Sequence, residues 1–177
     1  PFTLPNSMSY YGVNDVNGND TLPTKMIADA CKVADAAGTD FSKYDLDNDN
    51  YIDNVFVYYA GRNEAEGGGK NTIWPHRWAV VPGENYSGTT QSIRFDGKKL
   101  YSYACSSELK GSTGSTMCGI GTFTHEFGHV LGMVDYYHTA TATYKKTLEY
   151  WSIMDIGVYL NGGRTPPVYS CYDRFYL

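Results

Sequence analysis

Residues 124 to 135 hold the side chains of this sequence that are best suited to bind one metal ion. His125 and His129 stand four residues apart, Glu126 follows the first histidine, and Asp135 comes shortly after the second. On a helix, this spacing places both imidazoles on one face, about one turn apart, where they can bind the same ion. Glu126 would project beside the ion rather than at it, so it could accept a proton from water on the metal.

A third protein ligand is predicted from the residues that follow the helix. Gly132 can adopt a positive φ and turn the chain sharply, which would bring Asp135 back toward the ion. A carboxylate oxygen is an acceptable third ligand for zinc, and three protein ligands leave one position for water. Two histidines in the core or on the surface of an ordinary helix are the other interpretation, but the full HExxHxxGxxD pattern favours zinc. His138 and Glu149 are alternative third ligands, and Glu149 could instead contact a ligating histidine.

Hydrophobic patterns predict the elements that must position this site. A helix is predicted over residues 119 to 132, and another over 23 to 38 with Thr24 as N-cap and Gly38 after its last turn. The other predicted elements are a buried strand at 54–61, a strand at 71–81 interrupted at Pro75, a hairpin at 92–104 turning at Asp96-Gly97, and a last helix in 165–177 with proline in its first turn. Together they indicate an α+β (α/β-like) fold, in which one helix backs a twisted mixed sheet and the metal-binding helix lies beneath it.

Length and composition restrict the class of protein. The chain has 177 residues, of which 42% are hydrophobic, enough for one domain with a real core. The net charge is −5 and no basic stripe is present, which argues against a nucleic-acid partner. No apolar run approaches the roughly 18 residues that a membrane span needs, so no transmembrane segment is predicted.

The cysteines leave the redox compartment open. There are four, and none belongs to a CxxC pair, which makes a thiolate zinc site unlikely. Cys105 and Cys118 bracket a polar loop that one disulfide would close, whereas four free buried thiols are the alternative. An extracytoplasmic location would favour disulfides.

A second metal site is predicted in the acidic stretch of residues 45 to 53. Its residues match positions 1, 3, 5, 7 and 9 of an EF-hand loop, namely Asp45, Asp47, Asp49, the carbonyl of Tyr51, and Asp53. Position 12 is Phe56 rather than glutamate, so this is a calcium-type loop and no true EF-hand. Carboxylates this close repel one another, which favours a structural Ca²⁺. Glu64 or Glu66 could complete its shell, and a solvated acidic turn is the alternative.

Two further residues are candidates with ordinary explanations beside them. Met154 lies 29 residues after His125 and could form the tight methionine turn that underlies zinc in metzincins, although a methionine between aromatic residues is usually core. Glu108 could ligate a cation or simply lie on the surface.

The chain resembles the immune inhibitor A-like family of secreted bacterial metallopeptidases, within the metzincin clan. The matching stretches are YYG at 10–12, YDLDNDNYIDNVFVYYAG at 44–61, IWPHRW at 73–78, GIGTFTHEFGHVLGMVDYY at 119–137, EYWSIMDIG at 149–157 and the tail TPPVYSCYDRFYL at 165–177. The resemblance implies one zinc endopeptidase catalytic domain over 1–177, with a pro-region before it and often further domains. The beginning PFTLPNS and the end YDRFYL also lead us to expect a fragment truncated at both ends. It also implies a secreted or cell-surface location and protein or peptide substrates.

The resemblance assigns roles to residues, with two departures. His125, His129 and Asp135 would be the zinc ligands and Glu126 the general base. Val134 stands where relatives usually carry a proline, which leaves that turn less constrained. Ile156 stands where some metzincins carry a tyrosine that contacts the oxyanion, so that role is open.

Two other functions fit the same residues. One is a zincin-fold binding or adhesion module in which metals only stabilise the structure. The other is a zinc hydrolase that acts on an amide other than a peptide bond. Glu126 argues against the first, because a structural metal site has no need of a general base.

Overall fold

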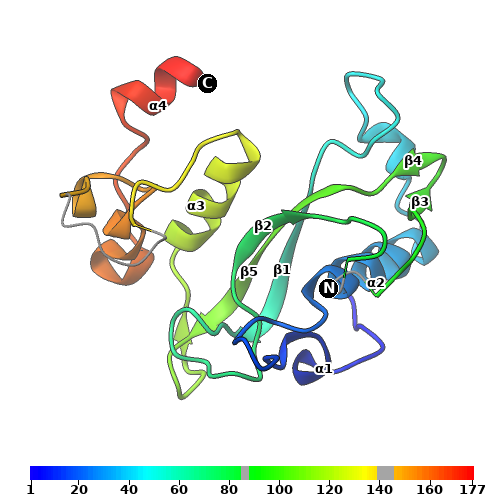
Figure 1. Cartoon of the computed structure of the whole chain (residues 1–177), viewed down its shortest axis with the longest axis horizontal. Helices are drawn as coiled ribbons and strands as arrows, with labels where there is room; N and C mark the ends of the chain where they lie inside the picture. The colour runs from blue at the N-terminus through cyan, green and yellow to red at the C-terminus, as the bar shows by residue number, and fades with distance from the viewer. Residues whose placement is uncertain (85–87, 139–145) are drawn as a thin grey trace. The chain divides into compact units, whose positions relative to one another are not determined.

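The computed structural model describes residues 1–84, 88–138 and 146–177, and the chain forms two compact units (Figure 1). The first unit runs from Pro1 to Ser115 and the second from Thr116 to Leu177. In the described residues, no helix is long and apolar enough to cross a membrane.

A mixed sheet forms the centre of the first unit. Its strands β1 (Val55–Arg62), β5 (Ser102–Lys110) and β2 (His76–Ala79) lie in the order β1-β5-β2 (Figure 1). Strand β5 pairs in parallel with β1 and antiparallel with β2. The predicted mixed sheet is confirmed, and β2 begins directly after Pro75, as expected for a residue that cannot donate to a strand ladder.

Helix α2 (Pro23–Ala36) provides the apolar face that covers this sheet. Its Met26, Ile27 and Cys31 are buried in one hydrophobic core with Tyr59 of β1 and with Tyr103 and Cys105 of β5. The helix therefore backs the sheet, as its sequence predicts. The shorter elements of this unit are α1 (Met8–Gly12), η1 (Phe41–Lys43) and the predicted hairpin, with strands β3 (Arg94–Phe95) and β4 (Lys98–Lys99).

Two details of these elements differ from the prediction. Leu22 rather than Thr24 is the N-cap of α2, because Pro23 takes the first helical position, which suits its fixed φ. Strand β1 is only partly buried, since Tyr58 and Ala60 are exposed on it. The continuous apolar run predicts a strand that is buried on both faces, whereas β1 is exposed at these two residues.

The disulfide between Cys105 and Cys118 that the sequence allows is not formed. None of the four cysteines, each in the described part of the chain, belongs to a disulfide, and Cys171 is exposed rather than buried. Cys105 is fully buried in β5, and its Sγ lies 3.5 Å from Nδ1 of His76. Its thiol is thus directed into the interior of the first unit. Burial raises the pKa of the Cys31 thiol to about 12, which keeps that side chain neutral.

The second unit is built around helix α3 (Ile120–Val130). The other elements are β6 (Thr116–Met117), the 3₁₀ helices η2 (Glu149–Trp151) and η3 (Ile156–Gly163), and α4 (Cys171–Tyr176). Helix α3 approaches η3 so closely that a Cβ on Gly121 would lie 2.0 Å from the carbonyl oxygen of Val158. Glycine at this position therefore lets the two backbones meet.

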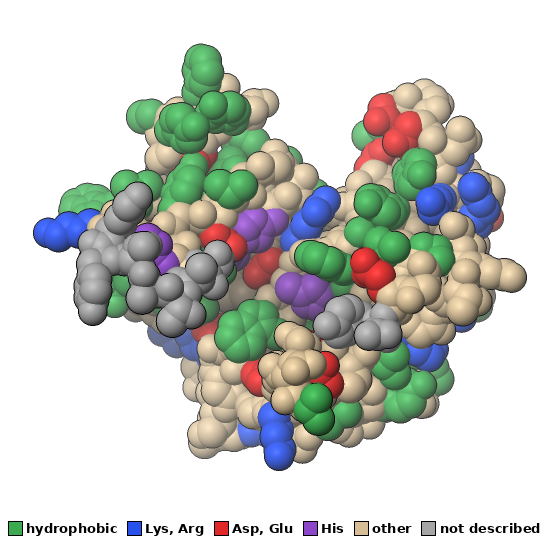
Figure 2. All heavy atoms as spheres, in the orientation of Figure 1, with side chains coloured by type: hydrophobic (Ala, Val, Ile, Leu, Met, Phe, Trp, Pro, Cys, Tyr) green, Lys and Arg blue, Asp and Glu red, His purple; other side chains and the backbone are tan. Residues whose placement is uncertain are grey.

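The last helix begins later than the sequence predicts. Proline is not in its first turn; instead Ser170 is the N-cap, and Ser170 and Asp173 bond reciprocally in a capping box. Hydrophobic side chains gather over this helix (Figure 2), where Tyr172, Phe175 and Tyr176 are exposed.

Candidate metal centre

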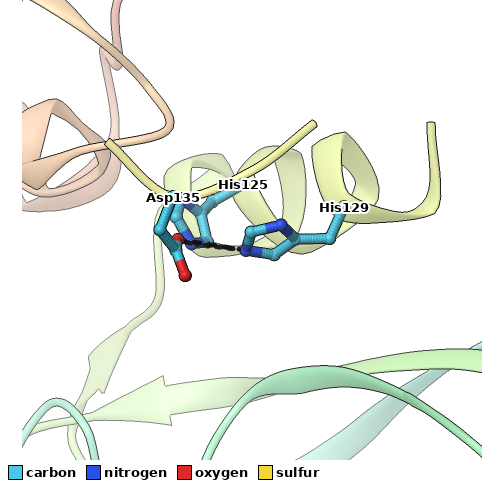
Figure 3. Close-up of side chains that lie close together, drawn as sticks. All are labelled: His125, His129 and Asp135. Atoms are coloured by element: carbon cyan, nitrogen blue, oxygen red, sulfur yellow. Dashed lines mark hydrogen bonds and ion pairs between the residues drawn. The ribbon is translucent and has the colours of Figure 1, made fainter. Parts of the chain in front are cut away.

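Three ligand atoms of the second unit converge at the end of helix α3 (Figure 3). The Nε2 atoms of His125 and His129 lie 3.2 Å apart, and Oδ1 of Asp135 lies 3.2 Å from each of them. Atoms bound at about 2.0–2.1 Å to one tetrahedral zinc ion stand about 3.3–3.4 Å from each other. The triangle therefore has nearly the size of one face of a zinc coordination tetrahedron.

Backbone carbonyls fix the orientation of both imidazoles. Nδ1 of His125 lies 2.8 Å from the carbonyl oxygen of Ile153, and Nδ1 of His129 lies 2.9 Å from that of Met133. Each Nδ1 must carry the proton to donate these bonds, which leaves a lone pair on each Nε2. Two lone pairs and a buried carboxylate oxygen without a hydrogen-bond partner then face one point, an arrangement that suits a cation.

The turn after α3 brings Asp135 to the histidines. Gly132 has a φ of +95°, and the amide of Met133 donates to the carbonyl of Gly128. This reversal is the one that the position of Gly132 predicts. Val134 is exposed at the turn, and the missing proline does not prevent Asp135 from reaching both imidazoles.

Met154 packs directly under helix α3. It is fully buried, and a Cβ on Gly128 would lie 2.6 Å from its Sδ, so only glycine fits at that helical position without a shift. Its carbonyl accepts from the amide of Tyr136, while the preceding carbonyl, of Ile153, holds His125. The segment around Met154 thus supports both the helix and the loop that carries Asp135.

The charges of the centre stabilise one another. Burial raises the pKa of the Asp135 carboxyl, but the two imidazoles, which without an ion can take up a proton on Nε2, outweigh it and hold that pKa well below its usual value. Burial likewise lowers the pKa of His129, but the Asp135 carboxylate, the Met133 carbonyl and the charge of Glu126 together raise it. Glu126 is itself buried, with 7% of its surface exposed.

No pattern in the sequence pointed to Tyr137, whose ring lies beside that of His125. Its ring stacks near that of His125, with centroids 6.2 Å apart. Tyr137 is 40% exposed, but partial burial raises the pKa of its phenol, and the charge of Asp135, a hydrogen bond with that carboxylate and the charge of Glu126 add to this effect. The phenol therefore stays protonated and can donate a hydrogen bond. The chain has 17 tyrosines, many of them on the surface, so residue type alone does not single out Tyr137. The one signal in the sequence is its position two residues after Asp135.

The alternative ligands do not join the three atoms. His138 and Glu149 are exposed, and neither belongs to the group formed by His125, His129 and Asp135. The amide of Glu149 instead donates to the buried carboxylate of Asp155. Ile156 begins η3, where its amide also bonds with Asp155.

The acidic loop of the first unit forms a second group of carboxylates. Oxygens of Asp45, Asp47 and Asp49 lie within 4.8 Å of one another, and Figure 2 shows acidic side chains clustered at this loop. Asn50 has a φ of +71°, the left-handed geometry expected where such loops favour glycine. The loop geometry therefore resembles the first half of a calcium-binding loop.

The rest of the predicted shell is arranged differently. The carboxylate of Asp53 accepts from the amide of Leu46 and lies outside the group of three, which does not include Tyr51. No sequence pattern pointed to Lys98, whose Nζ lies 2.6 Å from Oδ2 of Asp45. This lysine is the largest cause that lowers the pKa of Asp45.

The structure also places the remaining acidic candidates away from this group. Glu64 and Glu66 follow the far end of β1, where they accept from Asn14 and Asn63 respectively, and neither belongs to the group of three loop carboxylates. Glu108, on β5, is exposed and accepts from the amide of Gly61. It belongs to neither group of candidate ligands.

Comparison with known proteins gives one consistent result. Residues 2–177 match the family described as Immune inhibitor A peptidase M6, catalytic domain. Immune inhibitor A of Bacillus thuringiensis subsp. alesti is 29% identical over 97% of this chain and 28% of its own length. The Pre-pro-metalloprotease PrtV of Vibrio cholerae serotype O1 is 26% identical over 96% of this chain and 20% of its own length.

The chain thus spans less than a third of either relative. The matched region contains all three residues of the metal centre, the helix that carries two of them, and the segment of Met154 that supports it. On this evidence of sequence and site, the chain belongs to the immune inhibitor A peptidase M6 family.

Proposed function

We propose that this chain is a zinc-dependent endopeptidase domain, with His125, His129 and Asp135 as its zinc ligands. The observation that carries the proposal is the triangle of ligand atoms with sides of 3.2 Å. Its size fits tetrahedral zinc, its donors are two imidazoles and a carboxylate, and a face of three leaves one position open, as in catalytic sites. Family membership supports the reaction class, since one relative is named as a metalloprotease.

Each side chain has a distinct part in peptide hydrolysis. A bound zinc ion would supply Lewis acidity toward water and the scissile carbonyl. Glu126, next to His125 in sequence and buried, takes the proton of the attacking water and passes it to the leaving amine. The carbonyls of Ile153 and Met133 hold the two imidazoles with Nε2 toward the ion.

The Glu126→Ala variant tests this mechanism. It should bind zinc with the stoichiometry of the wild type yet lose peptidase activity on casein by at least about 100-fold, because a general base contributes about 10²–10⁴ to the rate. Glu108→Ala is the matched control, since Glu108 is an exposed glutamate that belongs to neither group of candidate metal ligands. Undiminished turnover by the Glu126 variant would remove the mechanism.

The same assay separates the other functions that the sequence allows. A zincin-fold binding module would bind zinc but cleave neither casein nor a peptide library. A hydrolase of non-peptide amides would leave the library intact while cleaving small amide substrates.

We further propose that the protein is secreted and that the loop of Asp45, Asp47 and Asp49 binds a structural Ca²⁺, since three carboxylate oxygens gather there.

A further inference from the structure

The first unit contains an open pocket whose lining residues belong to neither group of candidate metal ligands. It has a volume of about 420 Å³ and its wall includes Asp20, Glu64, Trp74, His76, Trp78 and Tyr103. We call it the tryptophan pocket. None of these six residues belongs to a group of candidate metal ligands.

Asp20 gives the pocket a buried acceptor that lacks a protein partner. The residue is only 8% exposed, and its Oδ2 accepts from the amide of Trp74 at 2.9 Å. Its Oδ1 is buried and has no hydrogen-bond partner among the residues that the structure describes. A carboxylate buried with so few hydrogen bonds is costly, and a positive charge in the pocket that Asp20 lines would offset that cost.

Glu64 places a second carboxylate in the same wall. Its Oε1 accepts from Nδ2 of Asn14 at 2.8 Å, which fixes the side chain. Within the described ranges, no lysine or arginine forms an ion pair with Asp20 or Glu64. Two neighbouring carboxylates without a cation favour the binding of a positive charge.

Aromatic side chains form another part of the lining, and Nε1 of Trp78 donates to the carboxylate of Glu84 at 3.2 Å. Trp74 and Trp78 are each about half exposed, and their indoles can pack on an alkyl chain or a cation. His76 bonds through Nδ1 with the carbonyl of Trp74 and through Nε2 with the hydroxyl of Tyr103, which also bonds with Thr24. Burial lowers the pKa of His76, so this imidazole is neutral and adds no competing charge.

These features select an organic cation over a metal ion. Calcium takes six to eight oxygen ligands, whereas this pocket offers two carboxylates and aromatic walls. Its volume also far exceeds that of a single ion. We propose that the tryptophan pocket binds an ammonium or guanidinium group on an alkyl chain, with Asp20 and Glu64 as counter-ions and the two indoles against the chain.

Titration calorimetry on the 177-residue chain tests this assignment. The ligands are N-acetyl-lysine methylamide, its arginine and norleucine counterparts, and free butylamine. The lysine or arginine compound should bind at least about tenfold more tightly than norleucine, which keeps the alkyl chain but lacks the terminal charged group. Tighter binding of the capped compounds than of butylamine would identify a polypeptide side chain as the ligand, and equal binding would identify small amines.

Matched variants locate the binding. Asp20→Asn and Glu64→Gln should each weaken binding by about tenfold or more, and Asn14 can still donate to a glutamine at position 64. Asp35→Asn, an exposed position on α2, removes the same charge and should bind as the wild type does. Melting curves show whether each variant is folded.

Three outcomes would overturn the proposal. The first is norleucine binding as tightly as lysine and arginine. The second is folded Asp20 and Glu64 variants that both bind like the wild type. The third is calcium that displaces the lysine compound in the wild type, which would make the pocket a metal site.

Discussion

At the scale of single residues, the candidate metal centre depends on hydrogen bonds that decide which imidazole nitrogen of each histidine can bind an ion. The carbonyls of Ile153 and Met133 occupy the Nδ1 atoms, so both histidines offer Nε2. Asp135 then supplies an oxygen at the same distance from each. The sequence identifies these three residues through their spacing, but the carbonyl partners lie far along the chain or in a loop and have no sequence signal.

Tyr137 is the residue that we expect to stabilise charge during the reaction. Its phenol is held protonated beside the centre, so it can donate to a developing oxyanion in the place of the tyrosine that Ile156 replaces. Tyr137→Phe should lower kcat by about 10- to 100-fold with little change in KM, since single oxyanion donors are worth up to about 10²–10³. Zinc content should be unchanged.

Steady-state kinetics with one peptide substrate provide the measurement for Tyr137. Tyr159→Phe is a useful comparison, because Tyr159 contributes only the smallest of the causes that raise the pKa of Tyr137. A Tyr137 variant with wild-type kcat would show that the phenol has no part in catalysis.

Asp20 should make the stability of the protein depend on pH. Burial, together with the charge of Glu64, raises the pKa of its carboxyl to about 7, although the amide of Trp74 opposes the shift. The folded state therefore binds more protons than the unfolded state between about pH 4 and pH 7, and the free energy of unfolding falls as pH rises through that window. Asp20→Asn removes this contribution and should gain roughly 1–2 kcal/mol relative to the wild type between pH 5 and pH 8, after allowance for solvent screening.

Urea unfolding of wild type and Asp20→Asn at both pH values gives this difference directly. Comparison of the two proteins at each pH cancels the effect of protonation at the metal ligands. A constant difference in stability across the window would show that Asp20 has an ordinary pKa in the folded protein.

At the scale of elements, the acidic loop is the part most dependent on a bound ion. Its carboxylates accept hydrogen bonds from the loop's own amides, and Lys98 of the neighbouring hairpin forms an ion pair with Asp45. Calcium should add to this support, because it contacts several oxygens at once. After treatment with EDTA, zinc alone should restore a lower Tm than zinc with calcium.

Differential scanning calorimetry measures this effect, and an Asp47→Asn/Asp49→Asn variant is the control. In that variant, calcium should no longer raise Tm. Equal melting curves of the wild type with and without calcium would mean that Lys98 and the loop amides suffice.

The elements that the sequence predicts well are those with a local signal. The helix of the HExxH pattern, the strand at β1 and the turn at Asp96-Gly97 are all present, because periodicity and turn residues act over short distances. Contacts between distant segments were missed. The pair of Lys98 with Asp45 depends on how two segments of the first unit pack, which no local pattern encodes.

At the scale of the whole molecule, the two units differ in how they are stabilised. The buried hydrophobic cluster of the described chain consists only of residues up to Cys105, all in the first unit. In the second unit, the buried apolar side chains are Ile153, Met154 and Val158, again among described residues. Other support in this unit comes from hydrogen bonds such as that of Tyr169 with the carbonyl of Thr124.

A unit with so small a core should depend on its metal for stability. Without an ion, the lone pairs of His125 and His129 face the carboxylate of Asp135, and the free energy of binding that zinc contributes to the folded state is lost. Removal of zinc with 1,10-phenanthroline, in calcium-containing buffer, should therefore speed trypsin cleavage in residues 116–177 at least about tenfold, with much less effect on residues 1–115. Mass spectrometry of the fragments locates the cuts, and restored zinc should reverse the effect. Equal acceleration in both units, or none in the second, would contradict this view, because a tightly packed second unit would keep its fold without metal.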